Sequence, residues 1–289
     1  MELVWINNTF PTLCYFCTAC RNADLSPLHY LPATEEEALE FKKLAVNYRS
    51  AIGSINYLST ATRPDLSHAV SSLSQFLENP GVNHWRGFLH ILRYLKGSPD
   101  VGLLYPKGPS GGIIAYSDAD WGNCGSSRRS VSGYLATLNG CLVLWKTRKQ
   151  PSVSLSTAEA EYKALCDLTS ELLWLRQWVK ECCLFTAVAP IVVHEDNQSC
   201  INAANGDCNV NNKRMKHVDI QLHFIKEVIR SSAIQLRYTP TSMMLADFLT
   251  KSVPRPTLSR ALSRLSVVRL GVRGDVENHL NTDQDDRHS

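Results

Sequence analysis

The sequence YSDADW, residues 116–121, stands at the end of an apolar run that begins at Ile113. We expect this run to form a buried strand whose end carries the carboxylate of Asp118. Just before it, the Lys107-Gly108-Pro109 segment marks a change from helical hydrophobic spacing to two-residue alternation. That change predicts a domain boundary, with the fold of the following residues built around the first strand.

The next two strands are expected to run antiparallel to the first. Residues 132–138 alternate and end at Asn139-Gly140, a strong hairpin signal, before residues 141–145 run back. A capping box at residues 156–159 then starts a helix of more than five turns. Further on, the pattern predicts a strand, a helix, a strand and a helix at residues 191–194, 213–229, 234–238 and 245–249. This order predicts an α/β fold with a mixed five-stranded sheet flanked by helices.

The part of the chain before the sheet has a helical pattern, with apolar residues recurring at helical spacing between residues 36 and 97. Arg63-Pro64-Asp65 interrupts this pattern, because proline suits a first helical turn and the residue before it resists helix. We therefore predict a small helical bundle in front of the sheet. The expected divisions are a poorly structured leader (1–40), a helical segment (41–108), the mixed-sheet domain (109–252) and a partly helical to disordered tail (253–289).

Composition sets broad limits on the class of protein. A chain of 289 residues with 44% hydrophobic content can form two compact units with a core. The net charge of +3 neither demands nor excludes a polyanionic partner. Ten scattered cysteines are typical of thiols in a reducing compartment, although Cys14, Cys17 and Cys20 could hold a metal ion if a fourth ligand came near. Polar residues and Pro11 interrupt the first apolar segment, so we expect no signal peptide or membrane span and a cytoplasmic or nuclear location.

Four acidic residues, each at a strand end or a helix start, are candidates for one site: Asp118, Glu161, Asp196 and Asp247. Taken singly, each also has a plainer explanation as a turn residue or as an acid favoured by a helix N-terminus. Asp120 and Glu159 are rivals, although Glu159 suits the capping box and Asp120 shares the strand face of Asp118. Carboxylates that converge repel one another and need cations, and Mg²⁺ prefers such oxygen ligands.

Residues from about 40 to 252 resemble the C-terminal part of the Pol polyprotein of Copia-type retrotransposons. The segments YRSAIGSINYLSTATRPDLSHAV and HILRYLKG are similar to the end of its reverse transcriptase region. The segments YSDADWG, RRSVSGY, WKTRKQPSVSLSTAEAEYKAL, EDNQS, KRMKHVDIQLHFIKE and LADFLTK are similar to its RNase H domain. The resemblance implies an RNase H-like fold and hydrolysis of the RNA strand of an RNA/DNA hybrid. It also implies that Asp118, Glu161, Asp196 and Asp247 are the catalytic, metal-binding carboxylates.

The cofactor expected from this resemblance is a pair of Mg²⁺ ions, with Mn²⁺ as a substitute, acting in phosphodiester hydrolysis. The chain has no segment resembling the paired-aspartate turn of a polymerase, so a reverse transcriptase palm and fingers region is an expected partner. The alternative function is a catalytically silent, nucleic-acid-binding remnant of a decayed retroelement.

Residues that could contact the nucleic acid lie beside the predicted acids. Asn197 and Gln198 could read a hybrid's minor groove and 2′-hydroxyls, or instead cap the next helix. Arg128, Arg129 and Lys149 flank the hairpin and could contact phosphates, or instead form a solvated charged face.

Overall fold

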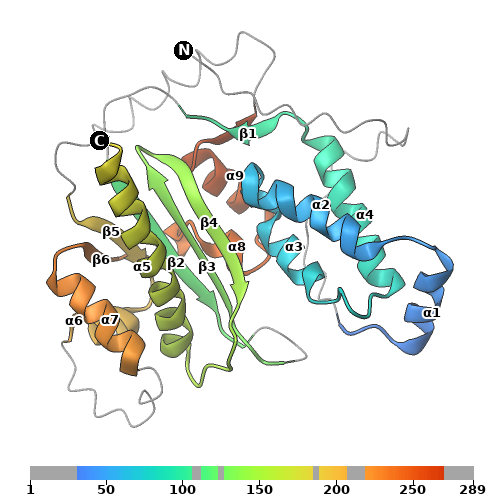
Figure 1. Cartoon of the computed structure of the whole chain (residues 1–289), viewed down its shortest axis with the longest axis horizontal. Helices are drawn as coiled ribbons and strands as arrows, with labels where there is room; N and C mark the ends of the chain where they lie inside the picture. The colour runs from blue at the N-terminus through green and yellow to red at the C-terminus, as the bar shows by residue number, and fades with distance from the viewer. Residues whose placement is uncertain (1–30, 106–111, 123–126, 185–188, 207–218, 270–289) are drawn as a thin grey trace.

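A mixed five-stranded sheet lies at the centre of the computed structural model, which describes residues 31–105, 112–122, 127–184, 189–206 and 219–269 (Figure 1). Its strands are β2 (Ile113–Asp120), β3 (Val131–Leu138), β4 (Cys141–Lys149), β5 (Ile191–Glu195) and β6 (Ile234–Tyr238). They lie in the order β4-β3-β2-β5-β6, with β2, β3 and β4 antiparallel and with β5 and β6 parallel to β2. Asn139 and Gly140 join β3 to β4 with positive φ, as two-residue hairpin turns require. The predicted mixed five-stranded sheet is confirmed.

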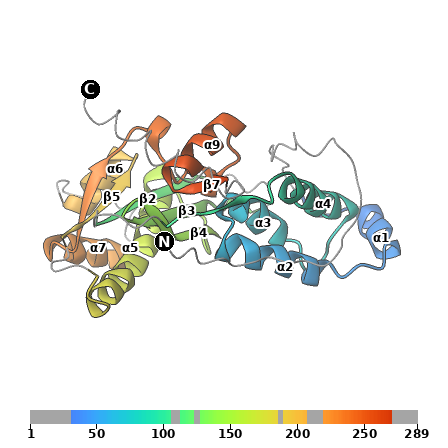
Figure 2. The ribbon, with the colours of Figure 1, turned by 90° about the horizontal axis from the view of Figure 1, so that it is seen from above.

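Helices cover both faces of this sheet, and Figure 2 shows α7 and α9 on opposite sides of it. Because side chains alternate along a strand, Ala136 joins the core beneath α5, whereas Leu135 joins the core beneath α8 and α9. The first core also includes Tyr162 and Leu165 of α5, both fully buried. The helices are α5 (Thr157–Glu181), α6 (Gln198–Asn205) and α7 (Asp219–Arg230) on the first face, and α8 (Asp247–Thr250) and α9 (Arg255–Arg264) on the second.

The helical bundle that was predicted to precede the sheet is present, and it lies beside the β4 edge (Figure 1). It consists of α1 (Glu35–Lys43), α2 (Tyr48–Ala61), the single 3-10 turn η2 (Pro64–Leu66), α3 (Ser67–Ser74) and α4 (Val82–Gly97). Trp145 of β4 connects the two parts, because its indole Nε1 donates a 2.7 Å hydrogen bond to the carbonyl oxygen of Ser59. Within the bundle, Arg63 and Asp65 form a buried ion pair at 2.7 Å, and Arg63 also donates to the carbonyl of Ser98 at 2.9 Å.

Residues near the predicted domain boundaries form helices and strands that belong to the fold. Helix α1 begins at Glu35, inside the range assigned to the leader, after a capping box with Thr34. A short strand after the bundle, β1 (Val101–Leu103), pairs antiparallel with β7 (Val267–Arg269). The predicted tail thus contributes α9 and β7 to the fold.

Several predictions lie outside the described residues. They are the structure of residues 1–30 with the Cys14, Cys17 and Cys20 group, the first part of the helix predicted from residue 213, and residues 270–289. No helix in the described ranges is both long and apolar enough to cross a lipid bilayer.

Candidate metal centre

The pairing of β2 with β5 brings Asp118 and Asp196 together. The last paired residues of these parallel strands are Tyr116 and His194, whose rings stack with centroids 4.6 Å apart. Asp118 and Asp196 each follow two positions later, and both therefore stand on the same sheet face at the carboxyl ends of adjacent strands. Such strand ends are where open α/β sheets commonly bind ligands.

Helix α5 supplies the third acid, Glu161. The helix begins at Ser156, whose hydroxyl accepts a 3.2 Å hydrogen bond from the backbone N–H of Glu159. One turn later, the small buried residues Ala160 and Ala164 pack against Ala119 of β2, which lets α5 approach the strand closely. Glu161 follows Ala160 directly, and the nearby backbone of Ala119 acts to lower the pKa of its carboxylate against the effect of burial.

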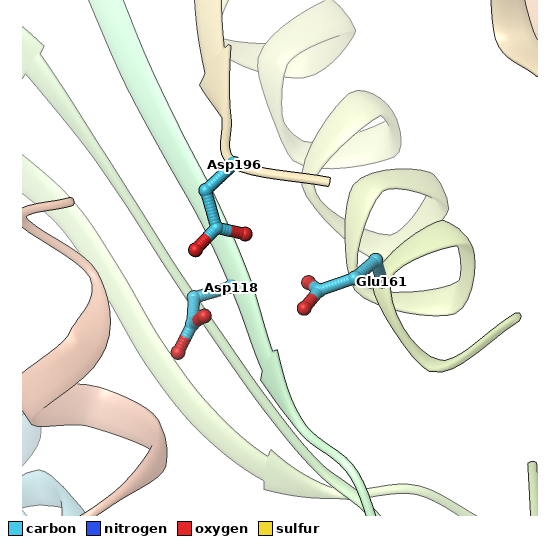
Figure 3. Close-up of side chains that lie close together, drawn as sticks. All are labelled: Asp118, Glu161 and Asp196. Atoms are coloured by element: carbon cyan, nitrogen blue, oxygen red, sulfur yellow. The ribbon is translucent and has the colours of Figure 1, made fainter. Parts of the chain in front are cut away.

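Asp118, Glu161 and Asp196 form a group in which each side chain offers an oxygen within 4.8 Å of the others. Figure 3 shows Glu161 pointing from α5 toward the strands and Asp196 pointing toward Asp118. The Oε2 atom of Glu161 is buried and accepts no hydrogen bond from the residues that the structure describes. Three carboxylates, one with a buried oxygen lacking a partner, match the hard oxygen ligands that Mg²⁺ prefers. The residues present therefore fit a divalent cation.

The electrostatics of the group also favour a cation. Burial raises the pKa of Asp118 to about 6, with Lys251 opposing and Asp247 adding to the increase. Burial, and next the charge of Glu195, raise the pKa of Glu161 well above its ordinary value. Desolvation and like charges both disfavour the ionised acids, so a bound cation would stabilise them.

Asp247, the fourth predicted acid, lies at the start of α8 near Asp118 but outside the group of three. Its Oδ1 pairs with Lys251 Nζ at 2.8 Å, one helical turn away. The hydroxyl of Thr250, between them, donates a short hydrogen bond to Oδ2 of Asp118. Helix α8 therefore brings an acid, a base and a hydroxyl to the edge of the site.

Comparison with known proteins identifies the family. No protein-family model matches the chain. It is 39% identical over 225 residues to the retrovirus-related Pol polyprotein from transposon TNT 1-94 of Nicotiana tabacum, covering 78% of this chain and 16% of that protein. It is 34% identical over 223 residues to the Pol polyprotein from transposon RE2 of Arabidopsis thaliana, covering 77% and 15%. The chain belongs to the Copia-type retrotransposon Pol polyproteins.

The Pol chain spans about one sixth of the length of these two relatives, by the coverage of 16% and 15%. It is also 47% identical over 130 residues to secreted RxLR effector protein 161 of Plasmopara viticola, covering 45% of the chain and 92% of that protein. A solved structure similar to it is LC11-RNase H1, isolated from compost by a metagenomic approach. That match has 19% identity and a TM-score of 0.37, and covers 52% of the Pol chain and 98% of the enzyme. The same enzyme in complex with an RNA/DNA hybrid matches with 18% identity and a TM-score of 0.36, covering 48% of the Pol chain and 93% of that chain.

One acid of the Pol chain's site was missed by sequence reasoning. Glu195 ends β5 and is fully buried, and its Oε1 accepts a 3.2 Å hydrogen bond from the backbone N–H of Asn197. Its Oε2 has no hydrogen-bond partner within the described ranges. A signal was present, because Glu195 continues the alternation of Ile191 and Val193, which are both buried. A charged residue on the inward face of a strand is unusual enough to mark a candidate site.

The residues predicted to contact nucleic acid lie in varied settings in the Pol chain. Asn197 Oδ1 caps α6 by accepting a 3.0 Å hydrogen bond from the backbone of Cys200, and Gln198 is exposed beside it. On the hairpin side, Arg128 is exposed with a positive φ, Arg129 donates to the carbonyl of Pro151 at 3.4 Å, and Lys149 donates to Gln75 of α3 at 2.7 Å. Their roles in binding stay predictions.

Proposed function

We propose that this Pol chain is a ribonuclease H that hydrolyses the RNA strand of RNA/DNA hybrids. The observation that carries the proposal is the meeting of Asp118, Glu161 and Asp196 at the carboxyl ends of two adjacent strands of an RNase H-like sheet. Membership of the Pol family supports it, because reverse transcription produces such hybrids. The chain spans only part of its relatives, so the activity of the whole polyprotein is not carried over.

The proposed cofactor is Mg²⁺, as two ions, with Mn²⁺ as a substitute. Asp118, Glu161 and Asp196 would hold it, with Asp247 as the fourth ligand. When bound, such ions lower the pKa of a water molecule and stabilise charge on the phosphodiester oxygens.

The chain's own residues would prepare the site for this chemistry. Thr250 holds Asp118 by a hydrogen bond, so this carboxylate is oriented before any ion arrives. Asn197 already uses its Oδ1 as a helix cap, which leaves its Nδ2 to donate to a 2′-hydroxyl of the RNA strand.

Basic residues and a partner protein would help this chain to bind the hybrid. Arg128, Arg129 and Lys149 would contact phosphates, with Gln198 beside the minor groove. A reverse transcriptase palm and fingers region would act with this chain and supply the hybrid. The five cysteines that the structure describes are all free, which supports action in the cytoplasm or nucleus.

The test is cleavage of a hybrid whose RNA strand carries an end label. We expect cleavage with Mg²⁺ and none with EDTA, and we expect Asp118→Asn and Asp196→Asn to lower the rate by on the order of 100-fold or more. Asp167→Asn is the matched control, because Asp167 is an acid of α5 that pairs with Arg148 at 3.5 Å outside the group of three. Full cleavage by Asp118→Asn would show that the site is wrong.

The same experiment separates the alternative function. A silent remnant would bind the labelled hybrid in a gel-shift assay without cutting it, in Mg²⁺ and in Mn²⁺ alike. Double-stranded RNA and double-stranded DNA serve as substrate controls, and we expect neither to be cut at a comparable rate.

A further inference from the structure

Lys251 brings a permanent positive charge to the Asp247 side of the acidic site. It follows the last residue of α8, and its Nζ lies 2.8 Å from Oδ1 of Asp247. About a third of the lysine side chain is exposed, against 14% for the aspartate, so the pair is shielded from solvent on the acid's side. An ammonium group therefore already occupies part of the space that a metal ion bound to Asp247 would need.

The positive charge of Lys251 also acts on other acids of the site. Burial works against the charged form of Lys251, yet Asp118, then Asp247 and Asp120, raise its pKa above the ordinary value. In return, Lys251 is the largest influence that lowers the pKa of Asp118 against the effect of burial. The lysine is thus a counter-ion to several acids on one side of the site.

The Glu161 side of the site differs from the Asp247 side in the charges that surround the carboxylates. Among the described residues, neither Oε2 of Glu161 nor Oδ1 of Asp247 accepts a hydrogen bond of regular geometry, but Oδ1 of Asp247 contacts the Lys251 ammonium at 2.8 Å. Glu161 instead offers an oxygen within 4.8 Å of oxygens of Asp118 and Asp196. The charges acting on Glu161 come from Glu195, Asp118 and Asp196, which all raise its pKa. In the described part of the chain, no basic side chain forms an ion pair with Asp118, Glu161 or Asp196, whereas Lys251 pairs with Asp247.

We propose that the Lys251 ammonium is the resident cation of the Asp247 half, so that the substrate-free protein binds one divalent ion, at Asp118, Glu161 and Asp196. This inference rests on the metal site of the proposed function. Two cations at the same carboxylate repel each other strongly at short range. A second ion can bind Asp247 only after Lys251 releases it, and the flexible stem of lysine allows that movement when substrate phosphate arrives.

The test counts Mn²⁺ ions bound to the full chain without nucleic acid, by isothermal titration calorimetry and by the electron paramagnetic resonance signal of free Mn²⁺. We expect one ion for the wild-type protein and two for Lys251→Met, which removes the charge and keeps a stem of similar shape. Lys163→Met is the matched control, because Lys163 also pairs one helical turn away, with Glu159 at 2.8 Å, but on α5. It should bind one ion, like the wild type.

Each possible ion count supports or contradicts the proposed role of Lys251. If the wild-type protein binds two ions, the proposed role of Lys251 is wrong, although the metal site itself stands. This result is obtained from the wild type alone and does not depend on whether a variant folds. One ion in both the wild type and a folded Lys251→Met would also overturn it. No ion in the wild type would refute the metal site of the proposed function itself. If Lys251→Met does not fold by circular dichroism, Lys251→Gln is titrated instead, because it keeps a hydrogen-bond donor near Asp247.

Discussion

Gly133 of β3 lies directly opposite Asp118 of β2, and helix α8 packs over this glycine. A Cβ at position 133 would lie 2.5 Å from Cγ2 of Thr250 and 2.8 Å from Cβ of Leu249, closer than real side chains approach. The missing side chain therefore lets α8 come close enough for Thr250 to hydrogen-bond Asp118. Gly133, which has no side chain, therefore helps to form the site.

Substitution of this glycine should separate α8 from the sheet. We expect Gly133→Ala to lower the free energy of unfolding by about 1–3 kcal/mol, the usual range for overpacking, and to reduce hybrid cleavage. Urea denaturation and the cleavage assay measure both. Gly53→Ala is the control, because Gly53 lies in α2 with nothing within 4 Å of its added Cβ, and alanine there should leave cleavage unchanged. Equal stability of Gly133→Ala and wild type would contradict this account of the packing.

The acids should make the metal-free protein sensitive to pH. The pKa of Asp118 is raised from 3.8 to about 6, so the folded state holds the proton more tightly than the unfolded chain does. The resulting stabilisation is complete below about pH 4 and is lost as the pH rises through about 6, by on the order of 3 kcal/mol. Unfolding in EDTA should show this loss, and Mg²⁺ should reverse it at neutral pH by binding the carboxylates. The loss should be smaller in Asp118→Asn, and identical pH profiles for variant and wild type would rule out this role of Asp118.

Glu195 should influence the metal without binding it. Burial raises the pKa of Glu161 most, and Glu195 adds to this increase, so Glu195→Gln should let Glu161 ionise at lower pH and shift Mn²⁺ binding to lower pH. Titration calorimetry at several pH values measures the shift. Glu161→Gln gives the contrast, because it removes a proposed ligand and should weaken binding by on the order of 10-fold or more. If Glu195→Gln weakened binding as much, Glu195 would itself be a ligand.

The contact between bundle and sheet should contribute to the stability of both parts. Trp145→Phe removes the 2.7 Å hydrogen bond to Ser59 while keeping an aromatic ring, and should cost about 1 kcal/mol. Trp178→Phe is the matched control, because Trp178 is an exposed residue of α5, 43% accessible. Urea unfolding followed by circular dichroism compares the two. A larger effect at Trp178 would mean that the indole of Trp145 does not join the two parts.

Much of the fold was predictable because it depends on local signals. The alternation in β2 and β3, the Asn139-Gly140 hairpin and the cap at Ser156 are each determined by neighbouring residues. The same local signals indicated that Asp118 stands on a strand and Glu161 near a helix start.

Other features were not predictable, since they depend on residues far apart in the chain. The range of α6 was not predicted, because a helix of eight residues is too short to show a clear helical period, although a helix after Asn197 and Gln198 was one alternative for those residues. The packing of α9 and the pairing of β7 with β1 were also missed, since a strand of three residues carries almost no pattern of its own.

Local patterns in the chain were enough to tell which residues are acidic, which elements carry them and which face of each element is apolar. The parallel pairing of β5 with β2, the position of Glu195 among the other acids and the contact of Lys251 with Asp247 arise only when distant segments pack together. The physical reason is that hydrophobic periodicity reports the faces of a single element. Distances between carboxylates depend instead on which strands pair, in what register, and on how closely a helix can approach a strand where alanine or glycine leaves room.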